Sequence, residues 1–486
     1  MPPDIFSPVY KEIPFESPCR VFGRLRSRKS FLFESVKGSE QTARYSFIGI
    51  DPYLTFKVKD GIIEIEFEGK KTISSRRPLS RLRELIQGYR QMPVAGLPPF
   101  QGGAAGMLTY NFVDYLEDIP QESIDDLDLP DAHFFMIDRL ISFDHKSRKS
   151  WIIVCPGAKE SALGYSDIAA DREECMKAAE AALEEIACRI AKNGSCEEIE
   201  TSGPGKGLPA IEIVQDWGKG QYMEMVKKAK EYIAAGDIFQ ANLSLRISAE
   251  IGDRDPWRIY GILRRINPSP FSSFVDFGDY QIVSSSPERL VRVIDGVIDT
   301  RPIAGTRPRG GNPGEDDRMR EELLLNEKER AEHIMLIDLE RNDIGRVSDY
   351  GSVEVDELMV TEDYSHVMHI VSNVKGKLAS GKDCFDVIKA TFPGGTITGV
   401  PKVRCMEIID EIEPVRRGPY TGSIGYVGFS GAMDLNIIIR TFLIKDGRAY
   451  IQAGAGIVAD SDPEREYFES LKKAEALMKT LEESET

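Results

Sequence analysis

The sequence predicts an α+β protein with large antiparallel β-sheets, and two observations support this class. Segments with strand character follow one another with helices set apart, instead of alternating regularly with helices as in a parallel sheet. The chain of 486 residues also exceeds what one simple core usually holds. We therefore expect two lobes or one large two-layer domain.

The elements predicted for the first lobe, residues 1–191, are mostly strands. Alternating apolar and polar residues predict strands, and helical periodicity predicts helices. The predicted strands are Tyr45–Ile50, Leu54–Lys59, Ile62–Glu68, Gly102–Tyr110, Ile137–Asp144 and Ser150–Cys155, and the predicted helices are Leu79–Arg90 and Ser166–Ala191. Residues 192–215 are polar and glycine-rich without an apolar period, which predicts a linker.

The second lobe, residues 216–486, has the same mixture of elements. The predicted helices are Tyr222–Ala235, Pro256–Ile266, Glu315–Leu339, Phe385–Thr391, Lys402–Ile412 and Pro463–Glu482. The predicted strands are Ile238–Ala249, Ser272–Phe277, Tyr280–Ser284, Leu290–Val297, Ser423–Phe429, Leu435–Ile444 and Ala449–Ala455.

Composition excludes several classes of function. The net charge of −17 argues against nucleic acid, whose binding proteins carry a basic stripe. An anionic substrate would instead need a local cationic pocket or a divalent metal. Seven cysteines without CxxC spacing favour a reducing compartment and argue against zinc. We find neither a signal peptide nor an apolar segment of membrane-spanning length, so we expect a cytoplasmic protein without a membrane partner.

Residues Thr300–Gly310 (TRPIAGTRPRG) form the most distinctive short segment. Its prolines and glycines predict a loop that could bring Arg301, Arg307 and Arg309 against a carboxylated ligand. The alternative is a turn between strands whose arginines are solvated.

Carboxylates at helical spacing indicate a second candidate site. Glu466, Glu469 and Lys473 share one face of the last helix, which suits a Mg²⁺ site beside a clamp for a substrate carboxylate. An exposed ion-pair face is the alternative. Glu329 and Glu332 form a second acidic pair on another helix.

Three of the five histidines, His333, His366 and His369, lie within a short span. We expect general acid or base chemistry rather than metal binding, with His369 as the strongest candidate. In FPGGTITGVPK, Thr396 and Lys402 lie next to a helix start and could bind a carboxylate. Gly454 and Gly456 would let a ligand approach the end of a strand.

Together these motifs resemble the chorismate-utilising enzymes: component I of anthranilate synthase and of aminodeoxychorismate synthase, with isochorismate and salicylate synthases as relatives. The matching segments are GDIFQANLS, SSSPERL, RPIAGTRPRG, NEKERAEHIMLIDLERNDIGRV, SHVMHIVSNV, FPGGTITGVPK, MEIIDEIEP, YTGSIGY, MDLNIIIRT and AGAGIVADSDPEREYFESLKKA. They cover nearly all of residues 221–486, and a weaker match extends into the first lobe.

The resemblance implies a two-lobed sandwich of large antiparallel sheets flanked by helices, and a Mg²⁺-dependent attack on chorismate. It implies three groups of site residues, matched motif by motif. Mg²⁺ would be held by Glu332, Glu466 and Glu469. The substrate carboxylates would be bound by Arg440, Lys473, Tyr420 and the backbone of Gly454–Gly456. The reacting ring would be surrounded by Glu288, Thr306, His369 and Thr396, with His369 or Glu288 helping the C4 hydroxyl to leave.

Gln240 indicates which nucleophile attacks chorismate, water or ammonia. Relatives that add water have a lysine at the matching position, whereas a neutral amide cannot act as the general base for water. The resemblance therefore favours ammonia. The chain has no G-x-C-x-G nucleophile elbow of its own, which implies a separate glutamine amidotransferase subunit as the ammonia source.

The motifs divide between two products. Ala304, in PIAGT, is the residue of anthranilate synthases, where many aminodeoxychorismate synthases have a lysine. In contrast, QANLS, SPERL, DLERND, PGGTITG and DLNIIIRT resemble the aminodeoxychorismate branch, whereas anthranilate synthases more often show QVVLS and DLGRND. We favour 4-amino-4-deoxychorismate, of the folate pathway, with anthranilate, of tryptophan biosynthesis, as the alternative. A non-catalytic binder of chorismate or of an amino acid is a third reading, which the intact glutamates oppose.

Overall fold

Two antiparallel β-sheets dominate the computed structural model, which describes residues 6–39, 42–161, 172–192, 199, 210–310, 312–363 and 367–485. In the described residues the first sheet has 12 strands. It runs in the order β1 (Val9–Ile13), β10 (Lys149–Val154), β9 (Arg139–Asp144), β3 (Tyr45–Gly49), β2 (Ser30–Glu34), β13 (Phe271–Asp276), β14 (Tyr280–Ser286), β23 (Thr441–Lys445), β24 (Arg448–Ile457), β12 (Gln240–Glu250) and β11 (Ile213–Gln215), with β20 (Gly399–Val400) paired to β12.

The second sheet also has 12 strands among the described residues. Its order is β17 (Ile303–Pro308), β19 (Val367–Lys377), β16 (Val297–Thr300), β15 (Arg289–Ile294), β22 (Met433–Ile437), β21 (Ser423–Gly428), β7 (Gly103–Leu108), β8 (Ala132–Ile137), β4 (Leu54–Lys59), β5 (Ile62–Phe67) and β6 (Lys70–Ser74), with β18 (Glu354–Asp363) paired to β19. The predicted fold class of large antiparallel sheets flanked by helices is confirmed.

Aromatic side chains fill the space between the two sheets. The rings of Phe47 on β3 and Tyr426 on β21 lie 5.3 Å apart between centroids, and Phe100 stacks on Tyr426 at 4.4 Å. All three side chains are buried. Burying one such ring contributes about 1.5–3 kcal/mol, so this inter-sheet layer is a principal source of stability.

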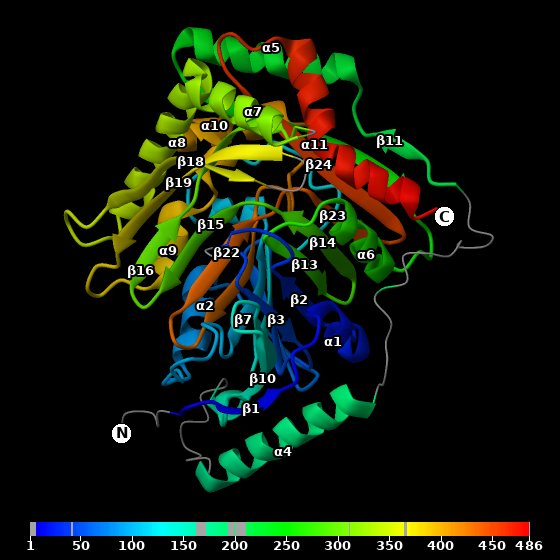
Figure 1. Ribbon diagram of the computed structural model, residues 1–486, viewed down its shortest axis with the longest axis vertical. Helices are drawn as coiled ribbons and strands as arrows, with labels where there is room; N and C mark the ends of the chain where they lie inside the picture. The colour runs from blue at the N-terminus through cyan, green and yellow to red at the C-terminus, as the bar shows by residue number, and fades with distance from the viewer. Residues whose placement is uncertain are drawn as a thin grey trace.

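The helices cover the outer faces and ends of the sheets (Figure 1). They are α1 (Pro18–Leu25), α2 (Pro78–Gln87), η1 (Tyr110–Tyr115), α3 (Ala158–Ser161), α4 (Arg172–Lys192), α5 (Lys219–Ala235), α6 (Pro256–Ile266), α7 (Pro313–Leu325), α8 (Glu327–Gly345), α9 (Cys384–Thr391), η2 (Gly395–Ile397), α10 (Lys402–Ile412) and α11 (Pro463–Glu483). The helices α5, α7, α8, α10 and α11 gather at one end of the molecule, and α4 lies at the other (Figure 1). No described helix is both long and apolar enough to cross a membrane.

Both sheets contain strands from each side of the predicted linker. The ladder between β2 and β13 pairs Phe33 with Ser273, and the ladder between β7 and β21 pairs Gly106 with Gly425. Continuous backbone hydrogen bonding therefore joins residues 1–191 to residues 216–486. The division into two lobes stays a prediction, and most of the linker lies outside the described residues.

Several predicted elements differ from the structure. The predicted strand Leu435–Ile444 is two strands in different sheets, β22 in the second sheet and β23 in the first. The predicted helix Glu315–Leu339 is two helices, α7 and α8, because Asn326 ends the first and caps the second: its side chain accepts a hydrogen bond from the Glu329 amide at 3.0 Å. The predicted loop at Thr300–Gly310 contains strand β17, which pairs with β19. Pairing with a distant strand supplies the hydrogen bonds that the local sequence does not reveal.

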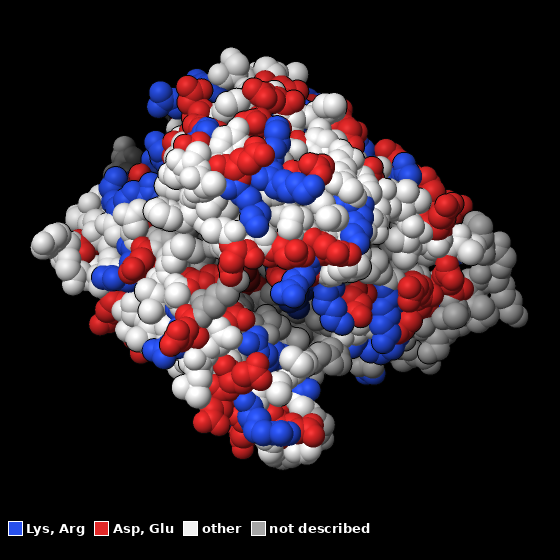
Figure 2. Space-filling model, turned by 90° about the horizontal axis from the view of Figure 1, so that it is seen from above, with Lys and Arg blue, Asp and Glu red and all other residues white. Residues whose placement is uncertain are grey.

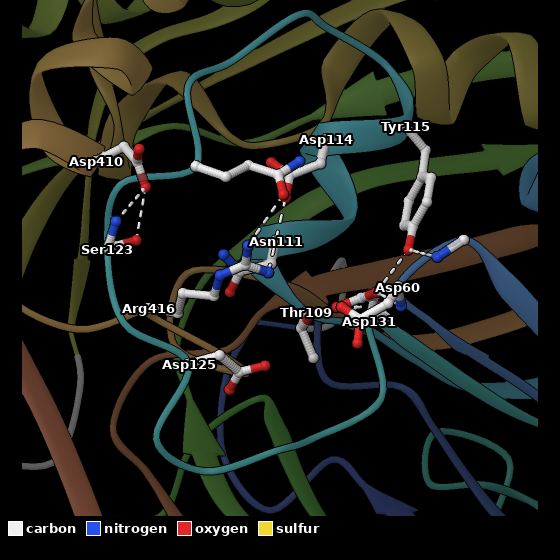
Figure 3. Close-up of polar contacts among 12 residues, drawn as sticks. Asp60, Thr109, Asn111, Asp114, Tyr115, Ser123, Asp125, Asp131, Asp410 and Arg416 are labelled. Carbon is white, nitrogen blue, oxygen red and sulfur yellow. Dashed lines mark hydrogen bonds and ion pairs between the residues drawn. The ribbon is translucent and has the colours of Figure 1, made fainter.

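The connection that follows η1 is attached to helix α10 and to the residues after it (Figure 3). Asp410 accepts hydrogen bonds from the Ser123 hydroxyl at 2.6 Å and from the Glu122 amide at 2.7 Å. Arg416 lies 3.8 Å from the Asp114 carboxylate. Burial raises the pKa of Asp114 to about 7, although the Arg416 charge acts in the opposite direction.

Candidate active site

A buried carboxyl group, Glu288, lies between β14 and β15. The hydroxyl of Thr396, in η2, donates a 2.8 Å hydrogen bond to Glu288 Oε1. Burial raises the pKa of Glu288 to about 7, while the Thr396 bond and the charges of Arg440 and Lys473 act to lower it. Near neutral pH this group is therefore partly protonated and can give or take a proton.

His369 lies on β19, directly opposite Thr306 of β17 in the ladder. Its Nδ1 is 3.0 Å from the carbonyl oxygen of Gly305. Because a carbonyl only accepts, Nδ1 carries the proton and Nε2 is an acceptor. Burial, with Arg440 second, lowers the pKa of His369 to about 4, so the imidazole is neutral at neutral pH. Gly305 has φ +62°, and a Cβ there would lie 2.8 Å from Leu323.

Arg440 connects these two groups electrostatically. It follows β22 with φ 50°, a left-handed conformation that is unusual for a side-chain-bearing residue. Its carbonyl accepts a 3.1 Å hydrogen bond from the Ser285 amide. The strain of such a conformation is typically found at functional sites. Because its charge acts on both Glu288 and His369, Arg440 lies where an anionic ligand could be held against them.

A second group of charged residues lies where β12, α8 and α11 meet. Gln240 Nε2 donates a weak 3.4 Å hydrogen bond to Glu332 Oε1. On α11, Lys473 donates to the Gly454 carbonyl at 3.0 Å and pairs with Glu469 at 2.9 Å. Burial raises the pKa of Glu332, and the negative charges of Glu329 and Glu469 add to that rise. Negative charge is therefore in excess around Glu332.

The carboxylates suit a magnesium ion that is completed by a ligand. No group of three or more histidine, cysteine or acidic side chains clusters tightly enough in the described residues to hold a metal by itself. However, Mg²⁺ is usually bound through one or two carboxylates, several waters and substrate oxygens. Glu332 and Glu469 interact electrostatically, and Glu466 lies in the first turn of the same helix as Glu469. The donors fit Mg²⁺ in this shared mode.

Tyr420 and the two glycines complete the predicted set. Tyr420 is buried, and its ring lies 5.6 Å from the guanidinium of Arg417. Gly454 and Gly456 lie on β24 opposite Ser244 and Asn242 of β12. The structure therefore brings Glu288 next to Thr396, His369 opposite Thr306, and Gln240 next to Glu332. Tyr420 packs against Arg417.

Sequence reasoning missed the buried pair beneath Tyr420. Arg417 donates to Glu413 at 2.7 Å and 2.9 Å, and both side chains are almost fully buried. Arg417 also donates to the Asn242 carbonyl at 2.6 Å. Asn242 was itself overlooked as a site residue. The available signal was a polar residue in QANLS, two positions after Gln240 on a strand that is otherwise buried.

Several basic residues that were candidates for ligand binding are paired with acids instead. Arg301 pairs with Glu357 and Glu362, Arg307 with Glu322 and Glu329, and Arg309 with Asp316. Lys402 contacts Asp343 and donates to the Thr391 carbonyl at 3.1 Å. These side chains therefore have acidic partners within the chain, and binding of a carboxylated ligand by this loop and Lys402 stays a prediction. The acidic partners lie outside the TRPIAGTRPRG motif, so the motif alone does not reveal them.

Of the other two candidate histidines, the structure describes only His333. His333 is buried and lies 2.7 Å from the Ser372 hydroxyl through Nε2, and burial lowers its pKa to about 4. This geometry is that of a structural histidine. His366 lies outside the described residues.

A cavity of about 580 Å³ lies apart from these residues, between the two sheets. Its lining includes Glu34, Pro270, Arg289, Tyr426 and Asp434, and Arg301 is the one described candidate for ligand binding that lines it. The Glu34 carboxylate is already held by Arg264 at 2.7 Å and by the Tyr260 hydroxyl at 2.8 Å. This cavity is therefore distinct from the residues predicted to bind chorismate and Mg²⁺.

The end of the molecule that carries α5, α7, α8 and α11 has a mixed surface charge. Figure 2 shows lysine and arginine interspersed there with aspartate and glutamate. The excess negative charge of the chain is therefore not gathered into one acidic zone on this face.

Known proteins resemble this chain over most of its length. A family model described as a chorismate binding enzyme matches residues 29–479. Aminodeoxychorismate synthase component 1 of Bacillus subtilis (strain 168) is 44% identical over 482 residues, covering 98% of each chain. Anthranilate synthase component 1 of Acetivibrio thermocellus is 43% identical over 471 residues, covering 96% of this chain and 93% of that one. The crystal structure of anthranilate synthase component I from Streptococcus pneumoniae TIGR4 superposes with a TM-score of 0.76 at 38% identity, covering 95% of this chain and 97% of that one.

Proposed function

Because this chain belongs to the family of chorismate binding enzymes, we propose that it replaces the C4 hydroxyl of chorismate with an amino group from ammonia. The product is 4-amino-4-deoxychorismate, the precursor of 4-aminobenzoate in folate synthesis. The chain is a chorismate-utilising synthase of the aminodeoxychorismate or anthranilate synthase type. The choice of C4 amination rests on the motifs QANLS, SPERL, DLERND, PGGTITG and DLNIIIRT.

The observation that carries amination, as opposed to hydration, is the amide of Gln240. It lies next to Glu332 in the site, at the position where water-adding relatives have lysine. An amide is neutral at all accessible pH values and cannot remove a proton from water. Ammonia needs no general base from the protein, because unprotonated NH₃ already has a lone pair available for attack.

Glu288 is the proposed acid. With a pKa of about 7 it is half protonated near neutrality and can donate its proton to the departing hydroxyl. The nitrogen lone pair forms the new C–N bond, the C4–O bond breaks, and the hydroxyl leaves with this proton as water. The new ammonium group then gives up one proton, which restores the acid.

His369 is a hydrogen-bond acceptor in this proposal. With its proton fixed on Nδ1 by the Gly305 carbonyl, its Nε2 can accept from the C4 hydroxyl and orient it. A pKa of about 4 makes it a poor proton donor at neutral pH. Of the two candidates for helping the hydroxyl leave, Glu288 is therefore the better acid.

Charge neutralisation is the remaining requirement, since chorismate is a dianion. Arg440, Lys473 and Tyr420 bind the carboxylates in this proposal, together with the backbone around Gly454 and Gly456. Glu332, Glu466 and Glu469 would hold Mg²⁺. The ion supplies Lewis-acid neutralisation of the ring carboxylate when it is bound.

The ammonia comes from a glutamine amidotransferase subunit in this proposal. The name component 1 of the relatives implies a second component, and the chain lacks a G-x-C-x-G elbow. The free cysteines Cys155, Cys384 and Cys405 are buried, which suits a reducing cytoplasm.

Anthranilate, with pyruvate as the second product, is the alternative. Ala304, buried on β17 next to Gly305, favours it because a lysine at this position is what many aminodeoxychorismate synthases have. The relatives named above include both types at nearly equal identity.

Product identification decides between these outcomes. The chain is incubated with chorismate, Mg²⁺ and an ammonium salt at high pH, with and without a lyase that converts aminodeoxychorismate to 4-aminobenzoate. We expect 4-aminobenzoate only when the lyase is present. Anthranilate without the lyase would establish the alternative, and isochorismate or salicylate would overturn amination.

A further inference from the structure

Two buried amide oxygens in the site have no partner within the described part of the chain. They are Oε1 of Gln240 and Oδ1 of Asn242. The two residues are 5% and 9% exposed, so bulk water does not solvate them freely. Leaving such an oxygen without a hydrogen-bond donor costs about 1–3 kcal/mol. Two such oxygens within a candidate site therefore point to a ligand that donates to them.

Both oxygens lie on the same face of β12, because the residues are two positions apart on one strand. The donation from Nε2 to Glu332 fixes the amide orientation of Gln240, so that its oxygen is the acceptor left over. Ser244, the next residue on this face, is satisfied: it donates to Glu413 at 2.9 Å and accepts from Gln452 at 2.8 Å. The unsatisfied acceptors are therefore confined to the active-site end of the row.

The neighbouring strand makes room for these amides. A Cβ at Gly456 would lie 2.4 Å from Gln240 Nε2, and a Cβ at Gly454 would lie 2.9 Å from Asn242 Oδ1. Any side chain at either glycine would displace one of the two amides. The two glycines thus leave room for both amides, and the Lys473 amine donates to the Gly454 carbonyl.

The backbone of Asn242 is held rigidly. Its N–H donates to the Thr398 carbonyl at 3.0 Å, and its carbonyl accepts from Arg417 at 2.6 Å. Arg417 is in turn fixed by its buried pair with Glu413. A side chain on such a fixed segment is preorganised, so that it loses little conformational entropy when it binds a small ligand.

We propose that Gln240 and Asn242 hold the ammonia that attacks chorismate, which makes Asn242 a further binding residue for the nucleophile. This inference rests on the proposed amination. Ammonia has three N–H donors and one lone pair. Two carbonyl acceptors on one strand bind two of its N–H groups and leave the lone pair directed away from them, toward the substrate.

A matched pair of substitutions tests this assignment. The two substitutions are Asn242→Val and Asn242→Thr. Valine and threonine side chains have nearly the same shape and both suit a strand, but only threonine keeps an oxygen acceptor. We measure the KM for free ammonia, the KM for chorismate, kcat and the melting temperature of the wild type and of both variants, with ammonium chloride as the nitrogen source.

We expect Asn242→Val to raise the KM for ammonia about five- to tenfold, the effect of one neutral hydrogen bond, with the KM for chorismate unchanged. Asn242→Thr should recover most of that loss. Equal ammonia KM values in all three proteins would overturn the assignment, as would a chorismate KM that rises in parallel. If the wild type itself yields no nitrogen-containing product, the proposed function fails first, and the nucleophile site fails with it.

Discussion

The hydroxyl of Thr396 donates a 2.8 Å hydrogen bond to the Glu288 carboxyl group, across 108 residues of sequence. This bond stabilises the charged form of Glu288, whereas burial stabilises the neutral form. Burial is the larger effect, and the pKa of about 7 that results is what suits a proton donor near neutral pH.

The first prediction concerns the pH dependence of the reaction. At a constant concentration of free ammonia, kcat should fall about tenfold per pH unit above pH 7, because the acid must be protonated. Thr396→Val removes a bond that lowers the pKa of Glu288, so the falling limb should move to higher pH. Thr391→Val is the matched control, since the Thr391 hydroxyl bonds only within α9 among the contacts described. If the falling limb of the kcat–pH profile has the same position in Thr396→Val and in the wild type, Glu288 is not the acid that protonates the leaving hydroxyl.

The second prediction concerns magnesium. Glu469→Gln should lower activity by at least about 100-fold, because a carboxylate at the metal contributes several kcal/mol to charge stabilisation. Its side chain is 55% exposed and its ion pair with Lys473 is solvated, so the free energy of unfolding should change by less than about 0.5 kcal/mol. Glu475→Gln, on the same helix and paired with Lys472, should leave activity intact. Similar activities in the two variants would disprove the metal assignment.

The third prediction concerns the nitrogen source. The purified chain should aminate chorismate with ammonium salts and show no turnover with glutamine. Adding a glutamine amidotransferase subunit should create glutamine-dependent activity without changing the product. Glutaminase activity in the chain alone, measured as glutamate release, would contradict the need for a partner.

The fourth prediction concerns Gln240. Gln240→Lys places an amine next to Glu332 in a buried position, where desolvation favours the neutral, basic form. We expect this variant to add water to chorismate, and the product formed in oxygen-18 water should carry the label. Gln240→Met removes the amide without adding a base and should form no labelled product. A labelled product from both variants, or from neither, would show that this side chain does not select the nucleophile.

The fifth prediction concerns stability and the buried carboxyl group of Asp114 (Figure 3). Its folded-state pKa of about 7 lies above the unfolded value, so the folded state binds the proton more tightly. The stability that comes from this tighter proton binding is fully present below about pH 4 and is lost as pH rises toward 7. Asp114→Asn should reduce the loss in the free energy of unfolding between about pH 4 and pH 7, measured by urea unfolding at each pH. The reduction should be about 1.4 kcal/mol for each unit by which folding raises the pKa of Asp114. Parallel declines in the two proteins would show that Asp114 is not perturbed.

Local patterns were predicted well where the interacting residues are neighbours in sequence. The strand Leu54–Lys59, the turn at Asp60–Gly61 and the strand that begins at Ile62 appear as β4 and β5 of one hairpin. Alternation and turn chemistry lie within about a dozen residues there, so the sequence carries all of the information. The helices Pro256–Ile266 and Lys402–Ile412 agree with the structure for the same reason.

The sequence names the candidate site residues without their arrangement in space. Its motifs identified Glu288, Glu332, His369 and Lys473, but which of them meet depends on strands that lie far apart in the chain. Gln240 reaches Glu332 across 92 residues because the first residue of β12 lies next to the N-terminal part of α8.

Charge and hydrogen-bond partners were likewise decided by tertiary structure. The arginines of residues 300–310 were visible, but their acidic partners come from other elements. Arg301 pairs with Glu362 of β18, a neighbour only through β19. Arg307 pairs with residues of α7 and α8, and Arg309 pairs with Asp316 of α7. The sequence by itself determined the residue types, the local elements and the family. The tertiary structure decided the protonation states and the unpaired acceptors at Gln240 and Asn242, because burial and electrostatic contact depend on distance in space and not on distance along the chain.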